Sequence, residues 1–349
     1  MFTYLAALVL APQFHSLNHL PLPKESDTFA FVVLGDNRPT GSGQPATPVF
    51  REILKEVGFI HPAFVLSLGD LLYGNDEPLA QYKVEANEMQ QILAGLKVPI
   101  FNAPGNHELA DKPEFEQEYV SRFGALWGSF DFGGCRFIAA CTDEVGHKSG
   151  ISDGQRAWIE KTVADGKPSF IGMHRPIFAR KGNLEEGASV DGAAGLHEQF
   201  HTHNVQAVFQ AHDHIFQHAT RDGVEYFISG GAGAPLDATP EEGGYFHYIL
   251  VHVAKGKATY QVLPLDSIQV SYVGSTIRVG NYAYGEIKLG DLTVHAAKPP
   301  TSATAYLDKK GKHIDVPIKI KAVEKDATGY TVHLSLKLGQ HRQTVIQLQ

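Results

Sequence analysis

The sequence predicts a layered α/β domain followed by a small all-β domain. Short apolar runs alternate with helix-like stretches from Phe29 onward, which is typical of helices packed against sheets. From about Leu265 the pattern changes to short alternating runs separated by Gly, Pro and Asp, as in a β-sandwich. The 349 residues suffice for one large and one small domain. We therefore expect an N-terminal segment at 1–28, an α/β domain at 29–265 and an all-β domain at 266–349.

Each element of the α/β domain follows from its pattern. Two apolar strands end in Gly-Asp, namely FAFVVLGD and FVLSLGD, and a third, VPIFNAPGNHE, runs into a Gly-Asn-His turn. Helical spacing from Thr47 to Gly58 and from Ala80 to Leu96 predicts the helices between them. Antiparallel strands are predicted for FDFGGCRFIAACTDE, then a helix for QRAWIEKTVADG, then strands for PSFIGMHRPIF and VQAVFQAHDH.

Composition and charge narrow the class of partner. The net charge of −8, the pI near 6.1 and the lack of a Lys/Arg run give no electrostatic footprint for duplex nucleic acid or anionic lipid. We therefore expect a small-molecule substrate. The 18 His residues make metal chemistry plausible. Cys135 and Cys141 lie on one predicted strand, roughly 20 Å apart at about 3.3 Å per residue, which is too far for a disulfide.

The N-terminal stretch from Met1 to Leu10 is apolar and is similar to the apolar region of a secretory signal. It favours export to the periplasm or the medium, although no Lys or Arg precedes it and Pro12 disturbs the obvious cleavage point. The alternatives are a mis-assigned start or a buried first strand in a cytoplasmic protein. With under 18 apolar residues, the stretch is too short for a stable membrane span.

Polar side chains gather where five predicted strands end, at LGD, LGD, PGNHE, MHRP and AHDH. Ligand sites in open sheets lie at the carboxyl ends of strands. Any one of these residues alone is more often a turn, a cap or a structural histidine, but the combination is that of a dinuclear hydrolytic site. Such donors suit iron, zinc or manganese rather than calcium. The candidate ligands are Asp36, Asp70, Asn106, His174, His212 and His214.

These five blocks resemble the signature of the calcineurin-like metallophosphoesterases, over about Phe29 to Leu265. Within that family the chain looks closest to the purple acid phosphatase branch, because GDLLYG at 69–74 and GNHE at 105–108 are similar to the motifs of that branch. The resemblance implies a four-layer sandwich of two mixed β-sheets flanked by helices. It also implies two metal ions, iron together with zinc, manganese or a second iron.

The resemblance further implies a role for each ligand. Asp70 would bridge the metals, Asp36 and His214 would hold the first, and Asn106, His174 and His212 would hold the second. His107 would point to the substrate, where it would stabilise the phosphoryl charge or protonate the leaving oxygen.

The motif GDNR departs from the common family pattern, because Arg38 stands where most members place a metal-binding histidine. Tyr73 is the candidate replacement, and as an anionic phenolate in this branch it implies iron(III). The alternative is that Tyr73 packs the loop while water completes the coordination sphere. Arg38 either binds two phosphate oxygens or pairs with a carboxylate as scaffolding. In a second departure, Ala211 replaces the Gly before HDH, which affects only local backbone geometry.

The predicted activity is hydrolysis of a phosphoester, most simply a phosphomonoester as in an acid phosphatase, by metal-bound hydroxide at the dinuclear centre. No GxSxG motif and no Cys beside a base supports acyl chemistry through a protein nucleophile. One alternative is a phosphodiesterase acting, for example, on cyclic nucleotides at the same site. Another is a non-catalytic module that binds metal or phosphate.

Overall fold

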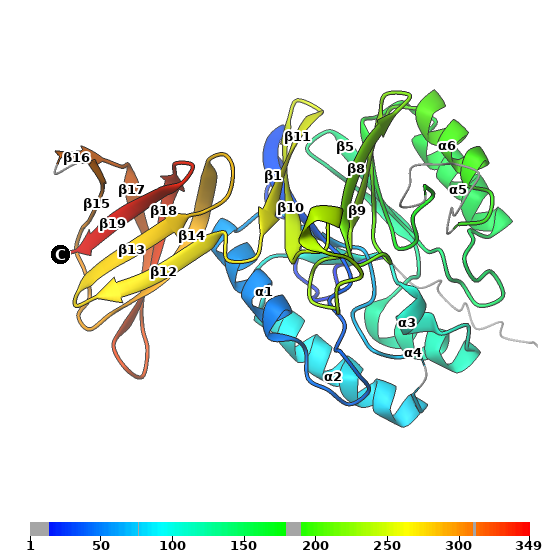
Figure 1. Ribbon diagram of the computed structural model, residues 1–349, viewed down its shortest axis with the longest axis horizontal. Coiled ribbons are helices and arrows are strands. Elements are labelled where there is room, and N and C mark those ends of the chain that lie inside the picture. The colour runs from blue at the N-terminus through cyan, green and yellow to red at the C-terminus, as the bar shows by residue number, and fades with distance from the viewer. Residues whose placement is uncertain (1–13, 76, 179–189, 310–311) are drawn as a thin grey trace, which may run out of the picture.

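The computed structural model describes residues 14–75, 77–178, 190–309 and 312–349. Two β-sheets lie face to face between two groups of helices, and a β lobe follows at the C-terminal end (Figure 1). This arrangement confirms the predicted layered α/β fold with its C-terminal all-β region.

The first sheet carries three of the five predicted ligand loops. In sheet order its strands are β11 (Lys257–Pro264), β10 (His247–Ala254), β1 (Thr28–Leu34), β2 (Val65–Ser67) and β3 (Ile100–Asn102). Strands β1, β2 and β3 are parallel, with Val33 opposite Leu66 and Leu66 opposite Phe101. Their carboxyl ends therefore meet at one edge. The face of this sheet that points away from the second sheet is covered by α1 (Pro48–Ile60) and α2 (Leu79–Gly95) (Figure 1).

The second sheet carries the other two ligand loops. In sheet order its strands are β4 (Gly128–Phe132), β5 (Cys135–Ala140), β6 (Ser169–Met173), β7 (Val205–Gln210), β9 (Val224–Ser229) and β8 (Phe216–Arg221). Strands β4 and β5 are antiparallel, as predicted, while β5, β6, β7 and β9 are parallel. Its outer face is covered by α5 (Asp153–Val163) and α6 (Ala193–Thr202) (Figure 1). Cys135 and Cys141, at the two ends of β5, are buried and unpaired, as predicted.

Phenylalanine side chains fill the space between the two sheets. Phe31 of the first sheet stacks on Phe64 with ring centroids 5.1 Å apart, and Phe137 of the second stacks on Phe170 at 5.2 Å. Phe31 also meets the edge of Phe137 across the interface. Such close packing between rigid rings leaves little freedom to slide. It fixes the carboxyl ends of one sheet relative to those of the other.

A side-chain cap and a proline mark the start of α1. Thr47 caps α1 by accepting a hydrogen bond from the N–H of Phe50 at 3.2 Å, and Pro48 occupies the first turn.

The predicted helices match α1, α2 and α5. The sequence patterns did not predict α6 or α4 (Pro113–Phe123), because α4 is polar apart from a buried stripe formed by Phe115, Tyr119 and Phe123.

Residues 14–27 pack on the α/β domain. The N–H of Leu17 donates to the Ile100 carbonyl at 2.7 Å, and the Asn18 side chain donates to the carbonyl groups at the end of α2. The signal-like stretch lies outside the described residues. In the part of the chain that the structure describes, no helix has the length and apolar character needed to cross a bilayer.

The C-terminal lobe consists of two antiparallel sheets. The first contains β12 (Ile268–Val273), β13 (Thr276–Asn281), β19 (Arg342–Leu348), β15 (Ala303–Lys309) and β16 (Lys312–Asp315). The second contains β14 (Ile287–Ala296), β18 (Tyr330–Leu338) and β17 (Ile318–Lys325). The lobe contacts the α/β domain where β14 packs against α1 (Figure 1).

A buried glutamate lies at this junction. Glu56 of α1 accepts hydrogen bonds from the N–H of Ile268 at 2.9 Å and from the hydroxyl of Tyr248 at 2.7 Å. Burial raises the pKa of Glu56 from 4.5 to about 7, although these two hydrogen bonds oppose the shift. Because the folded state holds this proton more tightly than the unfolded chain, the contribution of Glu56 to stability is fully present below pH 4.5 and is lost as the pH rises through about 7.

We expect Glu56→Gln to remove this pH dependence, because a neutral amide can accept the Ile268 N–H through its oxygen and donate to the Tyr248 hydroxyl through its NH₂ group, without a charge. Above pH 7 the variant should be more stable than the wild type by up to roughly 3 kcal/mol, and near pH 4.5 the two should converge. Denaturant unfolding of both proteins from pH 4.5 to 8 measures the difference. Glu160→Gln, an exposed change on α5, is the control. A pH-independent difference between Glu56→Gln and the wild type would contradict the buried-charge explanation.

Candidate metal centre

The structure brings the predicted ligand loops together where the carboxyl ends of the two sheets meet. Ligand atoms of Asp36, Asp70 and His174 all lie within 4.8 Å of one another, and all three side chains are buried. Asn106, His212 and His214 surround this group through the contacts described below. The three central residues follow three different strands, β1, β2 and β6, so the site exists only in the folded chain.

The backbone makes unusual turns at these positions. Asp36, Asp70 and His212 have φ values of 58°, 55° and 71°, in the left-handed region that non-glycine residues rarely adopt. Such conformations persist where the surrounding contacts over-determine them, and they cluster at functional sites. The methyl group of Ala211 fits because it faces Gly35, where an added Cβ would lie only 2.7 Å from it. The departure at Ala211 is thus matched by a glycine on the facing loop.

Asp36 and His214 form one half of the site. The Nε2 atom of His214 lies 3.5 Å from Asp36 Oδ1, and its Nδ1–H donates to the carbonyl of Pro235. Burial opposes protonation of His214, but the neighbouring Asp36 carboxylate raises the pKa of His214 to about 9. Asp237 adds a second carboxylate, 3.7 Å from His214 Nδ1. Asp36 Oδ2 accepts the N–H of His212 at 2.8 Å, whereas its buried Oδ1 has no hydrogen-bond partner among the described residues.

Asp70, Asn106, His174 and His212 form the other half. His174 Nδ1–H donates to the Leu68 carbonyl at 2.8 Å, which directs Nε2 into the site. That Nε2 atom lies 3.0 Å from Asn106 Oδ1, 3.4 Å from Asp70 Oδ1 and 3.3 Å from His212 Nδ1. Four potential ligand atoms therefore crowd around one point.

Asp70, His174 and His212 shift one another's pKa values. Burial alone would raise the pKa of Asp70, but the charges of His174 and His107 outweigh it and lower the pKa. Burial likewise opposes protonation of His174, while Asp70 and Asp36 raise its pKa. For His212, burial followed by the charges of His174 and Arg175 lowers the pKa to about 3. This half of the site therefore favours an ionised Asp70 beside a neutral His212.

His107, Arg38 and Tyr73 border the site. His107 donates from Nδ1 to the Tyr73 carbonyl, so its Nε2 faces Asp70 Oδ2 at 3.8 Å. Burial lowers the pKa of His107, opposed by the charge of Asp70. Arg38 Nε lies 3.7 Å from Asp70 Oδ2, and its guanidinium carbon lies 5.7 Å from the centre of the Tyr73 ring. The Tyr73 hydroxyl forms no hydrogen bond to any residue that the structure describes.

Three residues of the site were not predicted from the sequence. Glu108 is buried on the short helix α3 (Asn106–Leu109) and accepts hydrogen bonds from the N–H groups of Asp70 at 3.0 Å, Gly105 at 2.9 Å and Leu71. Arg175 directs Nη1 at His212 Nε2, 2.8 Å away, and is paired with Asp143. The sequence contained signals for all three, because Glu108 and Arg175 directly follow predicted site residues and Asp143 follows the end of β5.

The donor set fits metal ions. A buried carboxylate oxygen without a partner, at Asp36, is costly unless a cation or water satisfies it. Carbonyl acceptors fix His174 and His214 so that Nε2 faces the carboxylates, as ligating histidines usually are fixed. Carboxylate, amide and imidazole donors together suit first-row transition metals.

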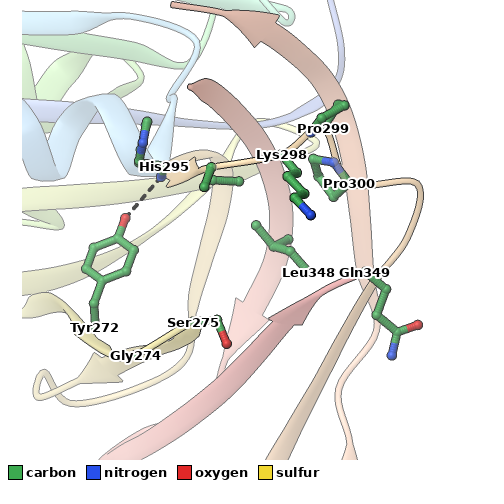
Figure 2. Close-up of a pocket in the computed structure, with 11 residues that line it drawn as sticks. Tyr272, Gly274, Ser275, His295, Lys298, Pro299, Pro300, Leu348 and Gln349 are labelled. Carbon is green, nitrogen blue, oxygen red and sulfur yellow. Dashed lines mark hydrogen bonds between the residues drawn. The ribbon is translucent and has the colours of Figure 1, made fainter. Parts of the chain in front are cut away.

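A separate cavity of about 740 Å³ lies in the C-terminal lobe, away from these residues. Figure 2 shows Tyr272, Lys298 and Leu348 around it, with the Tyr272 hydroxyl accepting the N–H of His295 at 3.1 Å. None of the candidate ligands lines this cavity. It is therefore distinct from the candidate metal centre.

The chain is similar to known proteins in both structure and sequence. The structure resembles a dimetal phosphatase from Danio rerio, with a TM-score of 0.51 and 13% identity over 72% of this chain and 95% of that one, which supports the fold. Acid phosphatase type 7 of Mus musculus is 24% identical over 245 residues, which are 63% of this chain and 53% of the mouse protein. The chain thus spans about half the length of this curated relative.

The family model for the calcineurin-like phosphoesterases matches residues 17–216, more than half of the chain. The matched range contains all six candidate metal ligands and ends just after the HDH block. The chain therefore belongs to the calcineurin-like phosphoesterase family, the hydrolases of phosphoester bonds whose signature the five strand-end motifs resemble.

Proposed function

We propose that this protein is a metal-dependent phosphomonoesterase of the acid phosphatase type. The observation that carries the proposal is the convergence of Asp36, Asp70 and His174 within 4.8 Å at the carboxyl ends of three strands. The similarity to acid phosphatase type 7 of mouse supports the choice of a monoester substrate. A small phosphorylated molecule is the expected substrate, because the negative net charge gives no footprint for a nucleic acid.

The two halves of the site suggest how two metal ions would be held. Asp36 and His214, together with Tyr73, would hold the first, and Asn106, His174 and His212 would hold the second, with Asp70 shared between them. Bound metal ions would supply a water of lowered pKa and would stabilise negative charge on the phosphoryl group. If Tyr73 is a ligand, its phenolate favours iron at the first position, with zinc, manganese or iron at the second.

Protein side chains would orient and protonate the substrate. Arg38 lies beside the proposed bridging ligand, with Nε 3.7 Å from Asp70 Oδ2, so its guanidinium is close enough to the centre to bind phosphate oxygens. His107 is held by the Tyr73 carbonyl and presents Nε2 beside Asp70, where it can donate a proton to the departing oxygen.

Replacing Asp70 or His174 by Ala should abolish turnover, because each removes a ligand from the centre of the site. We expect activity to fall by roughly 1,000-fold or more, equivalent to about 4 kcal/mol of transition-state stabilisation. Elemental analysis should show less bound metal in both variants. The exposed His201→Ala on α6 should behave as the wild type.

The same assays distinguish the competing functions. The wild type and both variants are tested on p-nitrophenyl phosphate and on bis(p-nitrophenyl) phosphate. Faster cleavage of the monoester supports the proposal, whereas faster cleavage of the diester indicates a phosphodiesterase. Metal binding without turnover of either ester would indicate a binding module. Wild-type rates in both variants would rule out this site.

Tyr73→Phe tests the first metal position. If the phenolate binds iron(III), the iron-loaded wild type should show a visible charge-transfer band that Tyr73→Phe lacks, since phenylalanine has no donor atom. Tyr284→Phe, at an exposed position in the C-terminal lobe, should keep the band. A band that persists unchanged in Tyr73→Phe would exclude the phenolate ligand.

Glu108→Gln should weaken metal binding although Glu108 is not a proposed ligand. Both carboxylate oxygens accept backbone N–H groups, so either amide orientation places an NH₂ group against one of these donors. We expect metal affinity to fall by about 10- to 100-fold, as is typical for groups that orient ligands. Calorimetric titration with Zn²⁺ measures the change. Equal affinities for Glu108→Gln and the control Glu114→Gln, on α4, would contradict this role.

A further inference from the structure

The four histidines of the candidate centre are oriented in two different ways. His107, His174 and His214 each donate from Nδ1 to a backbone carbonyl, and each presents Nε2 to a carboxylate. His212 is reversed. Its Nδ1 faces His174 at 3.3 Å, while its Nε2 lies 2.8 Å from Arg175 Nη1. A guanidinium only donates hydrogen bonds, so His212 Nε2 is the acceptor.

Arg175 is held in place by a buried network. Its Nε donates to both oxygens of Asp143, at 2.8 and 3.0 Å, and its backbone N–H donates to the Thr142 hydroxyl at 3.2 Å. That hydroxyl in turn donates to Asp143 Oδ2 at 2.9 Å. Arg175 is 8% exposed and Asp143 is 2% exposed, so water screens this charge pair little.

We propose that Arg175 is a positioning residue that lowers the metal affinity of the second position, to which His212 would contribute a ligand. The second position would then bind metal more weakly than the first. This inference rests on the proposed role of His212 as a metal ligand. Arg175 fixes which nitrogen of His212 faces the site, and it places a positive charge directly behind that ligand. At the first position the charge next to the histidine is negative, because His214 is flanked by the Asp237 carboxylate.

Two physical effects act in the same direction. The guanidinium charge repels a metal ion bound to the other side of the same imidazole ring. In addition, a neutral imidazole that binds metal through Nδ1 carries its hydrogen on Nε2, where it would meet the Arg175 N–H instead of an acceptor. Asp143 moderates the first effect, because its carboxylate balances the guanidinium charge, and its hydrogen bonds hold the guanidinium against His212.

Charge variants separate this role from a merely structural one. Arg175→Met removes the charge and the donor, and should tighten the second Zn²⁺ by about tenfold. Asp143→Asn leaves the guanidinium unbalanced and should weaken the same binding event by a similar factor. Calorimetric titration of the metal-free protein with Zn²⁺ measures both dissociation constants. The event that His212→Ala abolishes identifies the second position.

A matched pair elsewhere provides the control. Arg136 and Asp131 form a similar ion pair, with Nε 3.0 Å from Oδ1, between β4 and β5. Arg136→Met and Asp131→Asn should leave both Zn²⁺ affinities unchanged. Thermal unfolding reports whether each variant is folded, and Asp143→Asn decides the question alone if Arg175→Met is not.

The outcomes are distinct. Opposite shifts in Arg175→Met and Asp143→Asn support the proposal. Weaker binding in both would mean that the pair only holds the loop in shape, and no change in either would mean that Arg175 does not act on the metal position; both results overturn it. A wild type that binds fewer than two Zn²⁺ ions would instead overturn the proposed dinuclear function, and with it this role for Arg175.

Discussion

The geometry of the metal centre depends on one buried carboxylate that is not a proposed ligand. Glu108 accepts backbone N–H groups from the loop after β2, at Asp70 and Leu71, and from the loop after β3, at Gly105. A single side chain thereby sets the separation of Asp70, which follows β2, and Asn106, which begins α3 after β3. The same hydrogen bonds hold the left-handed backbone at Asp70, a conformation that costs free energy without such support.

The packing of the two sheets extends this constraint to the rest of the site. Phenylalanine rings from both sheets interlock, so the loops after β6 and β7 lie at a fixed distance from those after β1 and β2. Direct hydrogen bonds complete the connection, since the N–H of His212 binds Asp36 across the interface. Helices on the outer faces bury both sheets, which allows β1 to be apolar from Phe29 to Leu34. The ligands thus lie on short segments directly after strands whose positions are fixed by the packing of the sheets.

Charge is distributed unevenly across the centre. The half that contains His214 has two carboxylates close to the imidazole, those of Asp36 and Asp237. The half that contains His212 has the Arg175 guanidinium against the ring. Two metal positions in one site can therefore differ in affinity although both use imidazole ligands. Such a difference comes from the residues behind the ligands, in agreement with the general importance of these groups at metal sites.

The sequence alone determined the layered fold and the strand ends at which donors gather, because hydrophobic periodicity and turn residues are local signals. It predicted α1 and α2 from their apolar stripes and missed α4, whose buried face consists of only three aromatic residues. Only the tertiary structure decided which nitrogen of each histidine faces the site, that Glu108 joins two loops and that Arg175 pairs with Asp143. These contacts join residues on different strands and helices, so they exist only once the sheets have packed, and no local pattern records them.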